Sequence, residues 1–237
     1  MDSPTDLLAR SWLLVGRDDE IPGPGHYFTW ERTGIPLLVI RSADGEVRAF
    51  YNSCRHRGAP VVREERGRNR ALRCQYHSWT YDTFGRLVSV PDERDFVDLR
   101  IEDRPLIEIA ATVKGGWVLL NQDREAAAPV MEVPGEGFRL LTTIIVPSPA
   151  APENVATILE RLGPGAARSA AANAAFAAGA SEILALSAWP GAAGCELVLH
   201  VTVPAWDEEE DSPIETDSWQ RRLGDLRTAL EDIAASQ

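Results

Sequence analysis

The fold is decided by two short segments, CRHRGAP at residues 54–60 and CQYHSW at residues 74–79. The first has the pattern C-x-H, and the second has the pattern C-x2-H after a gap of seventeen residues. Two thiols and two imidazoles on a pair of loops predict a four-ligand metal site. Its expected ligands are Cys54, His56, Cys74 and His77.

Three interpretations of these four residues are open. Zinc sites usually draw a Cys pair from one loop and a His pair from another. Here each loop gives one Cys and one His, which suits a [2Fe–2S] cluster in which each loop sends its Cys to one iron and its His to the other. The pattern therefore favours a two-iron cluster over both zinc and four unrelated core residues.

The residues around the two segments predict a small antiparallel β domain. Asp44-Gly45 is a strong hairpin signal between two apolar runs, and residues 82–85 and 114–116 mark further turns. Trp79 and Tyr81 are expected to pack under the loops and shield the site from water. Short strands are expected at residues 11–15, 26–32, 37–41, 47–51, 71–74, 87–88, 106–109 and 117–120.

The two segments and their flanks resemble the Rieske domain of ring-hydroxylating oxygenase α subunits. The resemblance covers residues 7–122, including the lead-in LLARSWLLVGRDDEIPGPGHYFTWE and the exit strand GGWVLLNQD. It implies a mainly β Rieske [2Fe–2S] domain at residues 1–122, an antiparallel β sandwich with cluster-binding loops. Gln75 and Ser78 stand where the family usually has Pro and Gly, and the Ser78 hydroxyl either donates to the cluster or faces the surface.

In that family a helix-grip (START-like) catalytic domain follows and holds a mononuclear iron through two His and one carboxylate. Residues 123–237 are too short for the whole of it, and we expect a small α+β remnant. The Ala-rich residues 166–180 are expected to be a plain helix or a partly ordered linker. The other expected elements are a strand at 138–146, a helix at 154–162, strands at 182–189 and 195–203, and an amphipathic helix at 218–235.

The second half lacks the histidines that the family's iron site needs. If the family's motif is aligned on Asn154 and Glu160, its bridging acid and two iron-binding His fall on Pro164, Ala167 and Ala172. The whole chain has four His, namely His26, His56, His77 and His200. Only the last lies in the second half, so a two-His iron site cannot be built there, and mononuclear Fe(II) is expected to be absent.

Four other residues that could attract a functional interpretation are expected to be structural. His26 and His200 lie in strand-like runs, and each is expected to be an ordinary strand residue. Cys195 is expected to be a small buried residue. Asp211 lies roughly where the family has its carboxylate ligand, but within the run EEED it is expected to be a solvated loop charge.

Charge is distributed unevenly along the chain. Residues 1–122 carry 17 Lys and Arg against 18 Asp and Glu, whereas residues 123–237 carry 7 against 18. The arginines near the metal motif are expected either to keep the loops soluble or to form a basic rim that docks an acidic redox partner. They are Arg55, Arg57, Arg63, Arg66, Arg68, Arg70 and Arg73. The net charge of −12 argues against nucleic acid as a partner.

No apolar run approaches the ~20 residues of a membrane span, and the acidic N-terminal residues do not have the pattern of a signal peptide. Two of the three Cys belong to the metal motif, so no disulfide framework is expected. These features predict a cytoplasmic protein that does not associate with membranes.

Three functions fit these expectations. The favoured one is an electron-transfer subunit, an oxidoreductase component that is not catalytic alone. It would pass electrons from a ferredoxin or an NAD(P)H-dependent reductase to the mononuclear iron of a partner α-like subunit, in a hetero- or homo-oligomer based on the family's trimer. The alternatives are a self-sufficient mono- or dioxygenase with unusual iron ligands, and a non-catalytic structural or regulatory subunit.

Overall fold

The computed structural model describes residues 11–31, 34–129, 137–149, 155–162, 168–171, 174–178, 182–191, 194–204 and 216–236. The chain divides into two compact units, Met1–Val113 with Val118–Ala128, and Lys114–Trp117 with Pro129–Gln237. Within the described residues, no helix combines the length and the apolar character that a membrane crossing needs.

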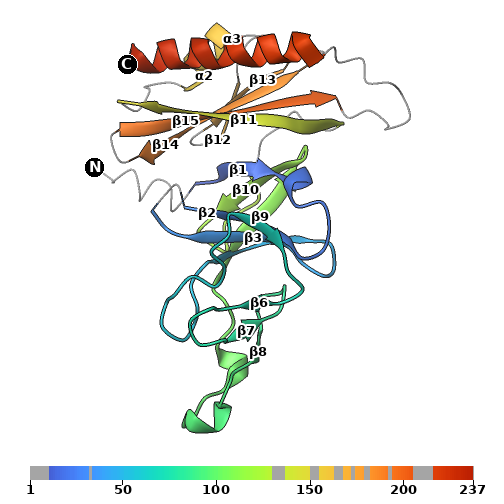
Figure 1. Ribbon diagram of the computed structural model, residues 1–237, viewed down its shortest axis with the longest axis vertical. Coiled ribbons are helices and arrows are strands. Elements are labelled where there is room, and N and C mark those ends of the chain that lie inside the picture. Colours follow the sequence, from blue (N-terminus) through green and yellow to red (C-terminus); the bar gives the residue numbers. More distant parts are fainter. Residues whose placement is uncertain are drawn as a thin grey trace. The chain divides into compact units, whose positions relative to one another are not determined.

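The N-terminal unit is built on a seven-stranded sheet in the order β1-β10-β9-β4-β3-β2-β5 and a three-stranded sheet in the order β6-β7-β8. The large sheet contains β1 (Leu13–Arg17), β2 (His26–Trp30), β3 (Leu37–Arg41), β4 (Val47–Tyr51), β5 (Arg66–Arg68), β9 (Glu108–Lys114) and β10 (Trp117–Asn121). The small sheet contains β6 (Leu72–Arg73), β7 (Thr80–Tyr81) and β8 (Leu87–Ser89). Figure 1 shows the small sheet in the same unit, labelled below β3.

The turn between β3 and β4 confirms the predicted Asp44-Gly45 hairpin. Gly45 has a φ of 90°, a left-handed conformation that costs glycine no side-chain clash. The Asp44 carboxylate accepts hydrogen bonds from the Ser42 hydroxyl at 2.5 Å and from the Glu46 N–H at 3.1 Å. This turn sets the antiparallel register in which Val39 lies opposite Ala49 at the centre of the sheet.

One apolar core joins the large sheet to the two segments that carry the candidate ligands. Tyr27, Leu38, Ile40 and Phe50 come from the sheet, and they pack in one cluster with buried residues of the loops. The loop residues of this cluster include Cys54, Val61, Val62, Leu72, Cys74, Trp79 and Tyr81. The loops are therefore fixed on the sheet by the same apolar contacts that fold the unit.

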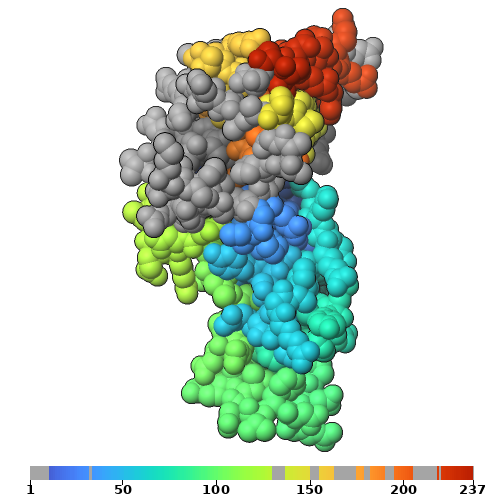
Figure 2. Space-filling model, turned by 90° about the vertical axis from the view of Figure 1, so that its left-hand side faces the viewer, coloured from blue at the N-terminus to red at the C-terminus, as the bar shows by residue number. Residues whose placement is uncertain are grey.

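Short 3₁₀ turns connect the small sheet to β9. They are η2 (Glu93–Asp95) and η3 (Ile101–Asp103). A third short 3₁₀ turn, η1 (Asp18–Glu20), follows β1 elsewhere in the unit. Most residues of the connection at 91–104 are exposed, and this green segment forms one end of the N-terminal unit in Figure 2. Its Phe96 and Leu99 turn inward and pack against the core of the loops.

The C-terminal unit is a five-stranded antiparallel sheet with two helices packed on it. The strand order is β11-β15-β14-β13-β12, and Figure 1 shows α2 and α3 on one face of the sheet. The elements are β11 (Phe138–Ser148), α2 (Val155–Leu162), β12 (Arg168–Ala171), β13 (Ala174–Ala178), β14 (Ile183–Gly191), β15 (Gly194–Pro204) and α3 (Thr216–Ala235). The helices bury Leu159, Leu226 and Leu230 against the sheet, as expected from the helical spacing of their apolar residues.

The prediction of a helix or linker for residues 166–180 is wrong, because this stretch contains β12 and β13. In β13, Phe176 pairs with Ala185 of β14, and Ala175 and Ala177 are 1 % and 0 % exposed. Alanine favours helix in isolation, but pairing to an existing sheet and burial under α2 outweigh that weak preference. The predicted mainly β class with a smaller α+β half is confirmed by the rest of the chain.

Candidate metal centre

The first candidate loop follows β4 and carries Cys54 and His56. The Cys54 N–H donates to the Ala59 carbonyl, and the Gly58 N–H donates to the Cys54 carbonyl, both at 2.8 Å. Gly58 has a φ of 76°, so the chain reverses through a left-handed residue that favours glycine. The two hydrogen bonds close a tight loop around the Cys54 side chain.

The second loop, between β6 and β7, repeats this geometry. The Cys74 N–H donates to the Trp79 carbonyl, and the Ser78 N–H donates to the Cys74 carbonyl, both at 2.9 Å. Ser78 occupies the position that Gly58 has in the first loop, and its φ is also left-handed, at 60°. The Ser78 hydroxyl accepts a hydrogen bond from Arg73 at 2.8 Å. Of the two orientations left open for this hydroxyl, the structure has the one at the surface.

Asn52 ties the first loop to the chain that leaves it. Its side-chain oxygen accepts hydrogen bonds from the N–H groups of Val61 and Val62 at 2.9 and 3.1 Å, and its amide donates to the Val62 carbonyl at 2.8 Å. The residue is 1 % exposed. A buried amide with three hydrogen bonds holds the loop in one conformation.

The four candidate ligands lie together as two pairs of like donors. Cys54 and Cys74 are buried free thiols in one cluster of the core, and the His56 and His77 rings meet edge to face at 4.5 Å. The four residues that the sequence singled out are thus brought to one place. His56 is half-buried and His77 is exposed, so the imidazole side of the site faces outward.

Aromatic side chains enclose the inner side of the site. Trp79 stacks on His56 with ring centroids 4.9 Å apart, and Phe96 meets His56 edge to face at 5.7 Å. The Tyr81 oxygen accepts a hydrogen bond from the Arg55 N–H at 2.9 Å and lies 3.3 Å from the Cys54 sulfur. A sulfur that binds a metal as a thiolate has no proton to give, so the Tyr81 hydroxyl would be the donor of this contact in the metal-bound site.

Burial sets the protonation of these groups in the metal-free chain. It raises the pKa of the Cys54 thiol, and it raises the pKa of Tyr81 with a further contribution from the hydrogen bond to Cys54. Burial lowers the pKa of His56, and the nearby His77 and Arg57 lower it further. A His56 ring held neutral has a nitrogen lone pair that can bind a metal, and metal binding would release the thiol protons.

The four donor atoms fit a two-iron cluster better than a single ion. The Nδ1 atom of His56 is buried and has no hydrogen-bond partner, as expected of an atom that binds a metal when one is present. Among the described residues, no group of three or more His, Cys, Asp and Glu side chains is arranged to hold one metal ion. A sulfur pair beside a nitrogen pair fits the division of ligands in a cluster with two His on one iron.

The family comparison decides which kind of domain this is. Residues 11–107 match the family described as the Rieske [2Fe-2S] domain. The chain carries a Rieske domain. The same region is homologous to the α subunits of Rieske oxygenases, as the sequence resemblance indicated.

Two curated relatives illustrate the extent of the match. Biphenyl 2,3-dioxygenase subunit alpha from Rhodococcus jostii (strain RHA1) is 40 % identical over 121 residues, which is 51 % of this chain and 26 % of the relative. Benzene 1,2-dioxygenase subunit alpha from Pseudomonas putida is 41 % identical over 122 residues, 51 % of this chain and 27 % of the relative. The matched region is thus about half of this chain but only about a quarter of either relative.

The similarity of fold extends beyond the Rieske domain. The apo form of the quaternary ammonium Rieske monooxygenase CntA aligns with 97 % of this chain and 78 % of its own, with a TM-score of 0.76 and 19 % identity. Naphthalene 1,2-dioxygenase from Rhodococcus sp. aligns with 97 % of this chain and 79 % of its own, with a TM-score of 0.66 and 17 % identity. At these identities the comparison establishes the fold of both units and nothing about their chemistry.

The residues expected to be structural lie outside the Rieske site. His26 Nδ1 lies 2.8 Å from the Gly23 carbonyl, and His200 is 6 % exposed with its Nδ1 3.0 Å from the Thr143 hydroxyl. Cys195 is buried, as predicted. The expectations for Asp211, and for the iron-site positions Pro164, Ala167 and Ala172, lie outside the described residues.

Sequence reasoning missed two residues that shape the site. Phe96 packs against the ring of His56 although it lies forty positions further along the chain. Asn52 holds the first loop by hydrogen bonds to the segment that leaves it. The order N-x-C-x-H carries a weak signal for Asn52, because Asn often bonds nearby backbone groups. Nothing in the charged segment around Phe96 indicates its contact.

Proposed function

We propose that this chain is the Rieske electron-transfer component of an oxygenase system, in which Cys54 and Cys74 hold one iron of a [2Fe–2S] cluster and His56 and His77 hold the other. The observation that carries the proposal is the pairing of two buried thiols beside two contacting imidazoles, one with an unpartnered buried Nδ1. The division into a Rieske domain at residues 1–122 and a reduced helix-grip-like domain at residues 123–237 is part of this proposal.

Each part of the site has a role in moving an electron. The cluster, when bound, supplies one-electron transfer at a higher potential than all-Cys clusters reach. The Tyr81 hydroxyl donates to the Cys54 sulfur and favours added negative charge there. Trp79 and Phe96 cover His56 on its inner side, whereas the exposed His77 gives a route to a partner at the surface.

We place the oxygen-activating iron on a partner chain. His200 is the one His of residues 123–237, and its Nδ1 interacts with Thr143. A facial triad needs two His and a carboxylate with open positions on the iron, so this chain is one imidazole short and mononuclear Fe(II) would be absent from it. The acceptor is then a catalytic α-like subunit, and the donor is a ferredoxin or an NAD(P)H-dependent reductase.

The assembly in this proposal is a hetero- or homo-oligomer based on a trimer, in the cytoplasm. A trimer allows the Rieske site of one subunit to lie near the catalytic iron of its neighbour. Support comes from the names of the relatives, several of which are designated as the alpha subunit of an oxygenase. Nucleic acid and membranes are not among the proposed partners.

The experiment is anaerobic purification of the tagged chain from its source cells, followed by single-turnover kinetics. A copurified partner is loaded either with Fe(II) or with redox-inactive Zn(II). It is then mixed with the dithionite-reduced chain, the partner's substrate and O2. We expect fast reoxidation of the reduced chain only with the Fe(II)-loaded partner, with two irons per chain in the isolated protein.

Either of two results would overturn the proposal. An isolated chain with three irons that turns over O2 without a partner is a self-sufficient oxygenase. A partner with full activity beside a Cys54→Ser variant that still assembles makes the chain a structural or regulatory subunit.

A further inference from the structure

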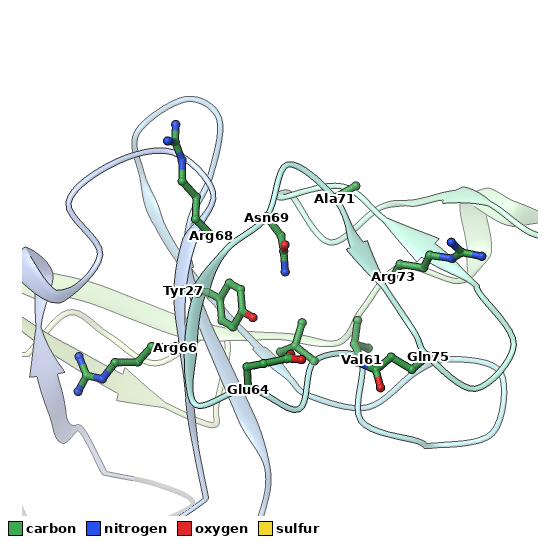
Figure 3. Close-up of a pocket in the computed structure, with 11 residues that line it drawn as sticks. Tyr27, Val61, Glu64, Arg66, Arg68, Asn69, Ala71, Arg73 and Gln75 are labelled. Atoms are coloured by element: carbon green, nitrogen blue, oxygen red, sulfur yellow. The ribbon is translucent and has the colours of Figure 1, made fainter.

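A groove lies beside the second Rieske loop, within the N-terminal unit. Its volume is about 400 Å³, and Tyr27, Val61 and Asn69 are among the residues that line it. Arg66, Arg68 and Arg73 form its rim, and we call this feature the Arg groove (Figure 3). No step of the proposed cluster chemistry uses these residues.

The pairing of β2 with β5 builds the inner wall of the Arg groove. Tyr27 lies opposite Gly67 and His26 lies opposite Arg68. A Cβ atom on Gly67 would lie 2.6 Å from the Tyr27 hydroxyl, so the absence of a side chain there lets the tyrosine lie across the strand. Arg66 and Arg68 are two positions apart in an extended strand and therefore project from the same face, and both are exposed.

The direction of the guanidinium groups decides what can bind. In Figure 3 the side chains of Arg66, Arg68 and Arg73 extend away from the hollow and from one another, while the Glu64 carboxylate lies toward its centre beside Tyr27. Diverging cations around a carboxylate cannot converge on one small anion such as phosphate. They can meet separate carboxylates spread over the surface of an acidic protein.

Two of the three rim arginines have no carboxylate partner in the described part of the chain. Arg68 donates to the Pro24 carbonyl at 3.4 Å and Arg73 donates to the Ser78 hydroxyl, so both keep their full charge for a partner. Arg66 differs, because it forms an ion pair with the nearly buried Glu20 at 2.5 Å. The net rim charge is therefore carried chiefly by Arg68 and Arg73.

The Arg groove adjoins both Rieske loops. Arg73 and Gln75, which line it, are the sequence neighbours of Cys74 on either side. Val61 and Val62 also line it and are held by Asn52, two residues before Cys54. A protein seated on the groove would contact the chain segments that carry both cysteines.

We infer that the Arg groove is the docking surface for an acidic, protein-bound [2Fe–2S] electron donor of the ferredoxin class. This inference rests on the proposed function and adds the place and the charge of the donor. The docked donor loses one electron, the oxidised cluster held by the two loops gains it, and no proton moves. Complementary charge raises the rate of encounter more than it raises the final affinity.

The test is stopped-flow reduction of the oxidised holoprotein by a reduced, acidic plant-type [2Fe–2S] ferredoxin. The second-order rate constant is measured between about 20 and 300 mM salt, a range over which screening becomes strong. We expect the wild-type rate to fall with salt, and Arg68→Glu to lower the low-salt rate by about three- to tenfold and flatten the salt dependence. Arg68→Lys keeps the charge and should retain the wild-type rate within about twofold.

The matched control is Arg227→Glu, the same charge reversal at an exposed helix position that makes a loose ion pair with Glu231 at 3.8 Å. It should leave the rate and its salt dependence unchanged. The reduction potential and the EPR spectrum should be the same in all four proteins, which excludes damage to the cluster as the cause of a slower rate.

The failure of this inference is distinguishable from failure of the proposed function. If wild type and Arg68→Glu both give a normal Rieske EPR signal and are reduced equally fast by the donor, the inference that the Arg groove is the docking surface is overturned, and the proposed function is not affected. Equal rate losses in Arg68→Glu and Arg227→Glu also overturn it, because net charge would then explain the effect. A chain that takes up no [2Fe–2S] cluster overturns the proposed function itself.

Discussion

Replacing the Tyr81 hydroxyl is the most direct way to change the reduction potential of the cluster site. Its oxygen accepts the Arg55 N–H at 2.9 Å and lies 3.3 Å from the Cys54 sulfur. The Tyr81 side chain is 0 % exposed. The substitution Tyr81→Phe removes only its hydroxyl oxygen and keeps the buried ring, so the packing of the loops is retained. The sulfur then loses a hydrogen-bond donor, and the Arg55 N–H loses its acceptor.

Both losses can be given a magnitude. A hydrogen bond to a charged group contributes about 1.5–3 kcal/mol, and only the part that is stronger in the reduced, more negative state changes the potential. If that part is about 1 kcal/mol, the one-electron potential falls by about 40 mV, since 59 mV corresponds to a tenfold change in the equilibrium constant. The unpaired Arg55 N–H costs about a further 1 kcal/mol of stability.

The assay is a redox titration of the holoprotein followed by EPR, together with thermal unfolding. Tyr27→Phe is the control, because Tyr27 is equally buried in the same unit and its hydroxyl bonds Asn69 and Glu64 instead of a sulfur. We expect Tyr81→Phe to lower the potential and Tyr27→Phe to leave it unchanged. A potential that stays the same or rises in Tyr81→Phe would refute the assigned hydrogen bond.

Three further predictions concern the stability of the two units. Asn52→Ala removes three buried hydrogen bonds and should lower the free energy of unfolding by about 2–4 kcal/mol, measured by urea denaturation. Ser78 has a left-handed backbone, a conformation that costs a non-glycine residue about 1–2 kcal/mol, so the melting temperatures should rank Ser78→Gly above wild type and Ser78→Ala below it. Arg222→Ala leaves the Glu182 carboxylate, whose side chain is 7 % exposed, buried without its bidentate partner, and should cost about 2–4 kcal/mol in urea denaturation of the C-terminal unit.

Each of these predictions has a result that would count against it. A loss below about 1 kcal/mol in Asn52→Ala would mean that water replaces its hydrogen bonds. A Ser78→Gly variant less stable than wild type would show that the Arg73 contact, which glycine loses, matters more than the backbone strain that glycine relieves. Wild-type stability in Arg222→Ala would mean that the buried carboxylate finds another partner.

The metal motif and most strands could be predicted from the sequence because local chemistry determines them. The spacing of Cys and His is set by the loop that must present both, and the Asp44-Gly45 turn needs a glycine at a left-handed position. The hairpin forms between β3 and β4, which pair in an antiparallel register. Apolar runs such as β3 and β10, buried along their length, are recognisable without tertiary information.

The parts that sequence reasoning missed depend on contacts between distant residues. The strand β5, with the sequence RGR, has no apolar pattern, and it forms because β2 offers a free edge. The Ala-rich strands β12 and β13 depend on β14 in the same way. Phe96 reaches His56 through a segment that otherwise has exposed charged residues. In each case tertiary pairing or burial outweighs local propensity.

The central claim is that two cysteines and two histidines hold a [2Fe–2S] cluster with both histidines on one iron. Pulsed EPR of the dithionite-reduced protein tests it most directly, because the unpaired electron couples to nitrogen atoms bound to iron. The account predicts a [2Fe–2S] signal with couplings to two imidazole nitrogens, one of which is lost when His56 or His77 is replaced. A protein that contains zinc and gives no signal, or a cluster signal without nitrogen coupling, would contradict it.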